Sequence, residues 1–189
     1  PDLRYSGLSD GDAFQMGWLD RKDVILWMDV ANQIYGDSTQ MVVHGISMGG
    51  ATTMMISGET QPDYVKCFVD DCGYTSVWDQ FSKELKEDFG IPAFPLLYTS
   101  SWLCDWTKGW NFTEASSLEQ VKKCSLPMLF IHGEKDDYVQ TWMVHELYKA
   151  KEEPKEIWVV PGADHATSYK LNKEEYTQKV KQFTDKYIQ

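Results

Sequence analysis

A glycine-rich hexapeptide constrains this chain more than any other feature. Residues 45–50 read Gly-Ile-Ser-Met-Gly-Gly. The apolar, β-branched run 41–44 precedes them and is typical of a buried strand. The proline-free run 51–57 follows and predicts a helix that ends at Gly58. The hexapeptide must therefore turn a strand into a helix within very few residues.

Such a sharp turn predicts a special role for Ser47. A residue between a strand and a helix is held in a strained conformation, and the positions two before and two after it must carry almost no side chain. Gly45 and Gly49 meet that requirement. An ordinary glycine-rich turn is the alternative for this pattern alone. The flanking strand and helix favour a nucleophile elbow that presents the Ser47 hydroxyl at the carboxyl edge of a sheet.

The rest of the chain alternates between strand and helix patterns. Further strands are predicted at 65–69, 128–131 and 157–160. Helices are predicted from Asp20 to Gly36, around 139–147, and after Asn172, an N-cap with Glu175 in the capping-box position. This alternation indicates an α/β fold, a three-layer sandwich around a mostly parallel sheet. The first helix has an apolar stripe that follows the 3.6-residue period: Val24, Trp27, Met28, Ala31, Ile34 and Tyr35.

Residues 71–125 interrupt the alternation with an aromatic-rich stretch. We expect this stretch to form a small helical cap, inserted into a core made of residues 1–70 and 126–189. Tyr98, Trp102, Trp106 and Trp110 recur every four residues, which predicts one helix face. The rings can pack the cap onto the body or wall a substrate pocket, and Trp78, Trp102 and Trp106 are the pocket candidates.

Composition excludes several classes of protein. The net charge of −11 argues against a nucleic-acid partner, because a phosphate backbone would be repelled. No apolar run approaches the roughly 18 residues of a membrane helix. The four cysteines lack metal-type spacing, and free thiols are favoured over disulfides. The sequence does not indicate a cellular compartment.

A serine hydroxyl needs an imidazole base that a carboxylate orients, so the four histidines can be compared. His44 and His132 lie at strand ends, and His145 lies within a predicted helix. His165 lies in a loop directly after the strand at 157–160, at the expected active edge, and is therefore the favoured base.

The carboxylate should follow the strand at 128–131. Three acidic residues stand there, Glu134, Asp136 and Asp137, and the spacing alone leaves them open. Each could equally be a surface charge, and Asp137 could be an acidic residue near a helix N-terminus.

The order of these segments resembles the α/β-hydrolase superfamily along the whole chain. Residues 45–49 look like its nucleophile motif, and 162–165 (Gly-Ala-Asp-His) look like its base segment. Residues 132–139 resemble its acid segment, in which the catalytic Asp stands three residues before Val139, so the resemblance implies Asp136 as the acid. Residues 2–9 are similar to the family's D-x-R-x-x-G-x-S loop. The motifs at 70–76 and 165–169 look like bacterial esterases and serine-peptidase-like proteins.

The resemblance implies acyl transfer to water without a metal or another cofactor. Ser47 would attack the carbonyl, His165 would move the proton and Asp136 would orient His165. The Met48 backbone N–H would stabilise the oxyanion. The expected substrate is a small-molecule carboxylic ester. A short-peptide serine peptidase and a thioesterase are the alternatives within the enzyme class. A non-catalytic fragment or binding protein on the same fold is the alternative outside it.

One departure from the family pattern concerns the start of the sheet. The family's second oxyanion N–H and its first strands lie upstream of the segment that residues 1–4 resemble, where we expect the end of a strand. The strand at 41–44 would then have an unpaired apolar edge. We therefore expect a missing N-terminal segment, or a partner in a homodimer, to complete the sheet.

Overall fold

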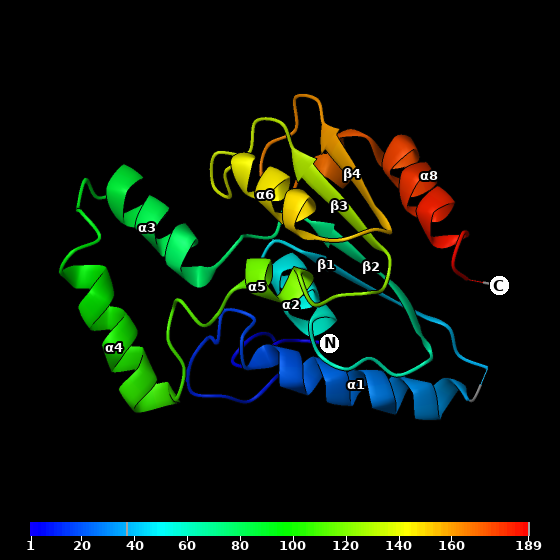
Figure 1. The fold of residues 1–189 in the computed structure, drawn as a ribbon, viewed down its shortest axis with the longest axis horizontal. Coiled ribbons are helices and arrows are strands. Elements are labelled where there is room, and N and C mark those ends of the chain that lie inside the picture. Colours follow the sequence, from blue (N-terminus) through cyan, green and yellow to red (C-terminus); the bar gives the residue numbers. More distant parts are fainter. Residues whose placement is uncertain (37, 189) are drawn as a thin grey trace.

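The sheet of this protein is parallel. Within residues 1–36 and 38–188, which the computed structural model describes, four strands pair in the order β1-β2-β3-β4 (Figure 1). Their bounds are β1 Met41–Ile46, β2 Val65–Asp71, β3 Met128–Gly133 and β4 Lys155–Val160. All four predicted strands are confirmed, each a little longer than its apolar run.

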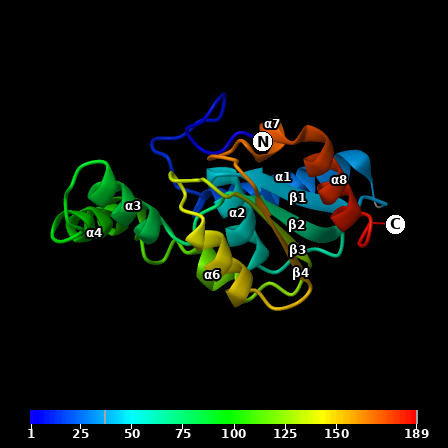
Figure 2. The ribbon, with the colours of Figure 1, turned by 90° about the horizontal axis from the view of Figure 1, so that it is seen from above.

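Helices cover both faces of the sheet. One face packs against α1 (Asp20–Tyr35), α2 (Met48–Ser57), α5 (Ser117–Val121) and α6 (Trp142–Ala150). The other packs against α8 (Lys173–Thr184), which the short helix α7 (Ser168–Leu171) precedes (Figure 2). Because both faces are covered, all six residues of β3 are buried. The α/β sandwich is the architecture that the alternating pattern predicted.

The helix at the C-terminus begins where the sequence placed it, but its cap differs. Asn172 is the N-cap of α8, yet its side chain makes no capping hydrogen bond. Asn172 also follows the last residue of α7, and its backbone N–H donates to the Ser168 carbonyl. The backbone at Asn172 is thus shared between two helices, which the capping-box pattern does not consider.

Strand β1 lies at an edge of the sheet, paired on one side with β2. A groove of about 300 Å³ runs along its other side, between β1 and α1, and Trp27, Met28, Val42 and Gly49 line part of it. Residues 1–4, where the end of a strand was expected, form no strand in the structure. The expected unpaired edge is therefore present.

The predicted apolar stripe of α1 is only partly buried. Met28 is buried in the main core, whereas Trp27, Ile34 and Tyr35 are 52%, 72% and 78% exposed. The outer part of the stripe is exposed because the sheet ends at β1, and no described strand lies beyond it for α1 to pack on.

Two helices between β2 and β3 project beyond the sheet. They are α3 (Val77–Glu87) and α4 (Leu96–Lys108), and both views place them away from the strands (Figures 1 and 2). Trp102 and Trp106 stack on α4 with ring centroids 6.1 Å apart. Trp110 does not share their face: the left-handed Gly109 ends the helix, and the ring turns inward, where its N–H donates to Gln15.

Two expectations from composition were tested. All four cysteines are free, and no disulfide joins them in the part of the chain that the structure describes. None of the described helices is both long enough and apolar enough to span a bilayer.

Candidate active site

Ser47 stands at the junction of β1 and α2 with a strained backbone. Its φ of +56° is unusual for a residue with a side chain. Its N–H donates to the Asp71 carbonyl of β2 at 2.8 Å, and its carbonyl accepts the Ala51 N–H of α2 at 2.9 Å. The strand and the helix together therefore hold Ser47 in this conformation.

The glycines around Ser47 differ from the prediction in which positions lack room for a side chain. A Cβ on Gly45 would lie 2.0 Å from the Gly49 carbonyl oxygen, so Gly45 must be bare. A Cβ on Gly50 would lie 2.4 Å from Asp70 Oδ1. A Cβ on Gly49 would meet nothing within 4 Å, because this residue lines the open groove beside β1. The steric requirement thus applies to Gly45 and Gly50 here, and the prediction for Gly49 was wrong.

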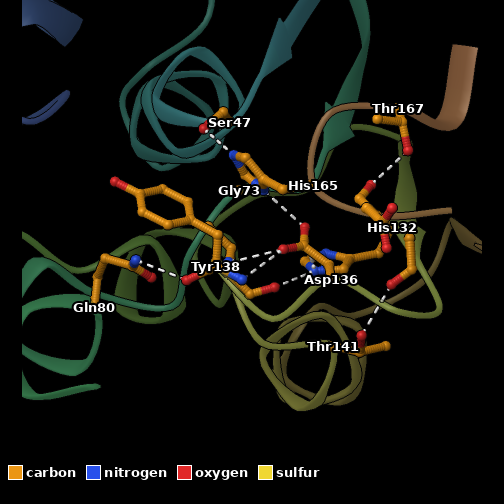
Figure 3. Close-up of polar contacts among 12 residues, drawn as sticks. Ser47, Gly73, Gln80, His132, Asp136, Tyr138, Thr141, His165 and Thr167 are labelled. Carbon is orange, nitrogen blue, oxygen red and sulfur yellow. Dashed lines mark hydrogen bonds and ion pairs between the residues drawn. The ribbon is translucent and has the colours of Figure 1, made fainter. Parts of the chain in front are cut away.

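His165 follows β4 and joins Ser47 to Asp136. Its Nε2 lies 2.7 Å from Ser47 Oγ, and its Nδ1 lies 2.8 Å from Asp136 Oδ2 (Figure 3). With Nδ1 protonated toward the carboxylate, Nε2 is free to accept the serine proton. The structure therefore brings three residues predicted from sequence into one hydrogen-bonded chain.

Asp136 is held more tightly than its acidic neighbours. Its Oδ1 accepts the Tyr138 N–H at 3.1 Å and the Val139 N–H at 2.9 Å, and its side chain is fully buried. Glu134 and Asp137 are exposed, and Glu134 accepts the Gly162 N–H instead. Of the three acidic residues that the spacing left open, Asp136 is the one bonded to His165.

The other histidines do not bond to Ser47 or His165, but His132 Nε2 lies 3.4 Å from Asp136 Oδ2. His132 is fully buried beneath Asp136, and its Nε2 bonds the Val139 carbonyl at 2.8 Å. Burial lowers the pKa of His132 below its usual value. His44 bonds the hydroxyl of Tyr176 on α8 at 2.9 Å, and His145 is exposed on α6.

Two further carboxyl groups lie beneath the site at the end of β2. Asp70 is completely buried, and burial raises its pKa well above the usual value. Asp71 Oδ2 accepts the Tyr176 hydroxyl at 3.0 Å, and burial raises the pKa of Asp71 to about 6. Burial, with Asp71 beside it, also raises the pKa of the Cys72 thiol. The floor of the site is thus rich in buried acids.

Sequence reasoning did not single out Tyr138 or Cys72. The Tyr138 ring is half-exposed, with its centroid 4.9 Å from that of His165, and its carbonyl accepts the Gln80 side chain of α3 at 2.9 Å (Figure 3). Its place between Asp136 and Val139 was the available signal. Cys72 follows β2 at the same sheet edge, a position that could have been read from the strand pattern.

The other residues predicted for the site are the oxyanion donor Met48 and three pocket tryptophans, whose side chains differ in solvent exposure. Met48 opens α2 directly after Ser47, where helix N–H groups have no partner within the helix. Trp78 is half-buried on α3, and its ring packs edge-to-face on Tyr98 of α4. Trp102 and Trp106 are 67% and 76% exposed. The assignment of these three tryptophans to a pocket stays a prediction.

Solved structures share this fold. An esterase of Pyrococcus furiosus, Pf2001, superposes with a TM-score of 0.76 at 22% identity, covering all of this chain and 70% of its own. An acylaminoacyl peptidase of Pyrococcus horikoshii superposes with a TM-score of 0.68 at 18% identity, covering 92% of this chain and 28% of its own. The α/β-hydrolase fold that the motifs implied is therefore confirmed.

A sequence relative and a family model also match this chain over most of its length. The chain is 27% identical over 184 residues to the uncharacterized protein YqkD of Bacillus subtilis strain 168, covering 97% of this chain and 60% of YqkD. It thus spans about three fifths of that relative's length. The model of the prolyl oligopeptidase family matches residues 11–189. The chain therefore belongs to the prolyl oligopeptidase family.

Proposed function

We propose that this protein is a serine hydrolase that cleaves carboxylic esters through an acyl-enzyme. The observation that carries the proposal is the hydrogen-bonded chain Ser47–His165–Asp136, with its 2.7 Å and 2.8 Å contacts. Esters are favoured over amides because their alkoxide leaving groups depart more readily and place a smaller demand on the site.

The reaction begins with proton transfer from Ser47 to His165. Ser47 Oγ attacks the carbonyl carbon, its proton passes to His165 Nε2, and the carbonyl electron pair moves onto oxygen. Collapse of this intermediate expels the alkoxide, which takes the proton from His165 and leaves the acyl group on Ser47. Water then repeats the sequence and releases the acid. Asp136 stabilises the imidazolium in both halves.

The oxyanion requires backbone donors. The Met48 N–H is the candidate in this chain, helped by the positive end of the α2 dipole. In the α/β-hydrolase family that the sequence resembles, the second N–H donor lies upstream of the segment that residues 1–4 resemble. Loss of one such donor typically costs about 10²–10³-fold in turnover, so a form that supplies the second donor should be the more active one.

We also propose that residues 71–125 act as a cap over the acyl site. The Gln80–Tyr138 hydrogen bond supports this, because it fixes α3 to the loop that carries Asp136. Tyr138 beside His165 would form the first wall of the pocket, and Trp78, Trp102 and Trp106 are proposed to extend it toward the substrate's apolar part.

Peptide hydrolysis is the second candidate. It is favoured by membership of the prolyl oligopeptidase family and by the likeness to an acylaminoacyl peptidase. A thioester would also fit the same attack by Ser47. A non-catalytic role on this fold would not account for the hydrogen bonds that join Ser47, His165 and Asp136.

The first test is covalent. A fluorophosphonate probe should add once to the protein, at Ser47, as read by intact mass and peptide mapping. Ser47→Ala should abolish the adduct and lower ester turnover by roughly 10⁴-fold or more. Unchanged turnover in Ser47→Ala would overturn the assignment.

Matched substrates then decide the bond that is cleaved. An ester and an anilide that carry the same acyl group should be compared by kcat/KM. An esterase is supported if the ester-to-anilide ratio of kcat/KM exceeds the ratio of the two hydrolysis rates in dilute base without enzyme. A preference for the anilide of a short peptide would assign the site to a peptidase.

We further propose that a strand from outside residues 1–189 pairs with the open edge of β1. The occupant is either a second copy of this chain or a preceding segment, as the unpaired edge and the groove beside it suggest. Light scattering should then give a dimer, or an extended chain should be more active and less prone to aggregate. A stable, equally active monomer of these residues alone would contradict the proposal.

A further inference from the structure

Among the residues that the structure describes, Cys72 is the cysteine that lies at the candidate active site. It is completely buried directly after β2, with a backbone φ of +52°. Its N–H donates to the Ile131 carbonyl of β3 at 2.9 Å, while the preceding Asp71 carbonyl accepts the Ser47 N–H. The proposed hydrolysis makes no use of its sulfur. The thiol therefore lies under the triad without an assigned task.

Three metal-ligating groups converge at this point. One ligand atom each from Cys72, Asp136 and His165 lie within 4.8 Å of one another. For His165 the nitrogen that faces Asp136 is Nδ1, at 2.8 Å from Oδ2. Thiolate, imidazole and carboxylate together suit Zn²⁺, which binds S at about 2.3 Å and N or O at about 2.0–2.2 Å. Two such bonds to one ion span at most about 4.5 Å, so the three side chains must move closer together to share it.

The surroundings of the three groups favour a cation. Asp70 and Asp71 are almost fully buried beside Cys72. Asp70 Oδ2 and Asp71 Oδ1 have no hydrogen-bond partner among the described residues. In the same part of the chain, no lysine or arginine forms an ion pair with Asp70, Asp71 or Asp136. The basic groups that contact Asp136 are the imidazoles of His165 and His132, at 2.8 Å and 3.4 Å, so a positive ion would add to the stabilisation of these buried carboxyl groups.

We propose that Cys72, Asp136 and His165 bind Zn²⁺ as an inhibitory ion that switches off the nucleophile. The ion replaces the proton that His165 Nδ1 shares with Asp136. The binding site stands independently of the proposed function, and its inhibitory consequence rests on that function. The proposed hydrolysis uses Ser47, His165 and Asp136, and the ion acts on it only as an inhibitor.

The inhibition follows from the tautomer of His165. When Zn²⁺ bonds to Nδ1, the neutral ring must carry its proton on Nε2. Nε2 then donates to Ser47 Oγ and cannot accept the serine proton, so the general base is lost. Zn²⁺ also displaces the Cys72 S–H proton to solvent, which gives a net release of one proton per ion bound. Removal of the ion restores the Nδ1 proton and the active arrangement.

The binding test uses Co²⁺ as a spectroscopic substitute for Zn²⁺. A Co²⁺ ion bound to a thiolate has a sulfur-to-metal charge-transfer absorption in the near ultraviolet. We expect the protein of residues 1–189 to show this band with one equivalent of Co²⁺ and to lose it on addition of Zn²⁺. Cys72→Ala should lack the band. Cys124→Ala, which removes another buried thiol, should keep it. No band in the wild type, or an equal band in Cys72→Ala, would overturn the site.

The inhibition test uses ester turnover. Zn²⁺ should inhibit the wild type, Mg²⁺ should not, and EDTA should restore activity. Relative to its own metal-free turnover, Cys72→Ala should require at least about tenfold more Zn²⁺ for half inhibition, since even the loss of a supporting group typically costs 10–100-fold in metal affinity. Equal Zn²⁺ sensitivity of the two proteins would contradict the proposal. If Cys72→Ala failed to fold, Cys72→Ser provides a variant of similar size.

The two proposals can fail separately. A wild type that shows the Co²⁺ band but neither labels with the fluorophosphonate nor hydrolyses esters keeps the metal site and loses the proposed function. A wild type that labels and hydrolyses but shows no band and no Zn²⁺ inhibition keeps the function and loses the metal site.

Discussion

The two sides of the candidate site are held in contrasting ways. The acid–base side rests on β3 and β4, where Asp136 is buried, accepts two backbone N–H groups and lies on the buried ring of His132. The nucleophile side rests on β1, an edge strand beside an open groove. Ser47 is fixed by its strained turn, whereas Asp136 is fixed by the interior of the protein.

The difference shows where the site depends on the rest of the molecule. Asp136 is held by residues of this chain, so the effects of substitutions near it should not depend on whether a strand covers β1. Substitutions near Ser47 act on a turn whose outer side lies against the groove, so their effects should change when a strand covers β1.

The largest expected effect is on the acid side. Asp136→Asn would favour the wrong tautomer of His165, because the amide can donate to Nδ1, and should lower kcat by roughly 10⁴-fold. Steady-state ester kinetics measure the loss. Asp137→Asn changes the exposed neighbour and should stay near wild-type activity. Similar losses in both variants would show that Asp136 has no special role.

The next effect concerns the turn at Ser47. Gly45→Ala places a Cβ 2.0 Å from the Gly49 carbonyl and should lower the free energy of unfolding by about 1–3 kcal/mol or more. Gly49→Ala meets open space and should be neutral, or stabilise by up to about 1 kcal/mol through helix propensity. Urea unfolding of the two variants compares them. A larger loss in Gly49→Ala would mean that the groove is filled in solution.

A smaller effect concerns the pH dependence of stability. Burial lowers the pKa of His132, and its Nδ1 has no partner among the described residues, so the folded protein binds this proton poorly. As pH falls below about 6.5, the unfolded chain takes up the proton first and the free energy of unfolding drops, by at most about 1.4 kcal/mol per pH unit for one proton. Above that pH the contribution is fully present.

Two variants isolate this contribution. His132→Gln should flatten the dependence of unfolding free energy on pH between 6.5 and the folded-state pKa, whatever its stability at pH 8. His145→Gln alters an exposed ring on α6 and should leave the slope unchanged. Parallel slopes for wild type and His132→Gln would show that other groups cause the acid sensitivity.

The smallest expected effect lies in the groove beside β1. Trp27 is 52% exposed, so Trp27→Ala in this chain should change the free energy of unfolding by less than about 1 kcal/mol. In a dimer or an extended chain that covers β1, the same substitution should cost more. Equal, small effects in both forms would place the partner strand away from Trp27.

The sequence predicted the parts of the fold that follow local patterns. All four strands and the helix at Asp20 are set by apolar runs and periodicity, which act over a few residues. Ser47 and His165 could be found because a parallel sheet collects the carboxyl ends of its strands at one edge. The assignment of Asp136 as the acid required the family resemblance, since the spacing alone did not distinguish it from Asp137.

The other features depend on packing that no local pattern records. Burial of the α1 stripe depends on how many strands the sheet holds, and the inward turn of Trp110 depends on the left-handed Gly109. Tyr138 and Cys72 become neighbours of His165 only when three loops meet. Periodicity predicts which side of a helix is apolar, but it does not identify the surface that this side contacts.

The arrangement of the strands also makes activity a measure of folding cooperativity. Ser47 follows one edge strand and His165 follows a strand at the opposite edge, and 118 residues separate them along the chain. Their 2.7 Å hydrogen bond therefore closes only when all four strands are assembled. Probe labelling of Ser47 should vanish in the same denaturant range as the loss of the sheet, because a chain in which β4 has detached no longer holds His165 beside Ser47.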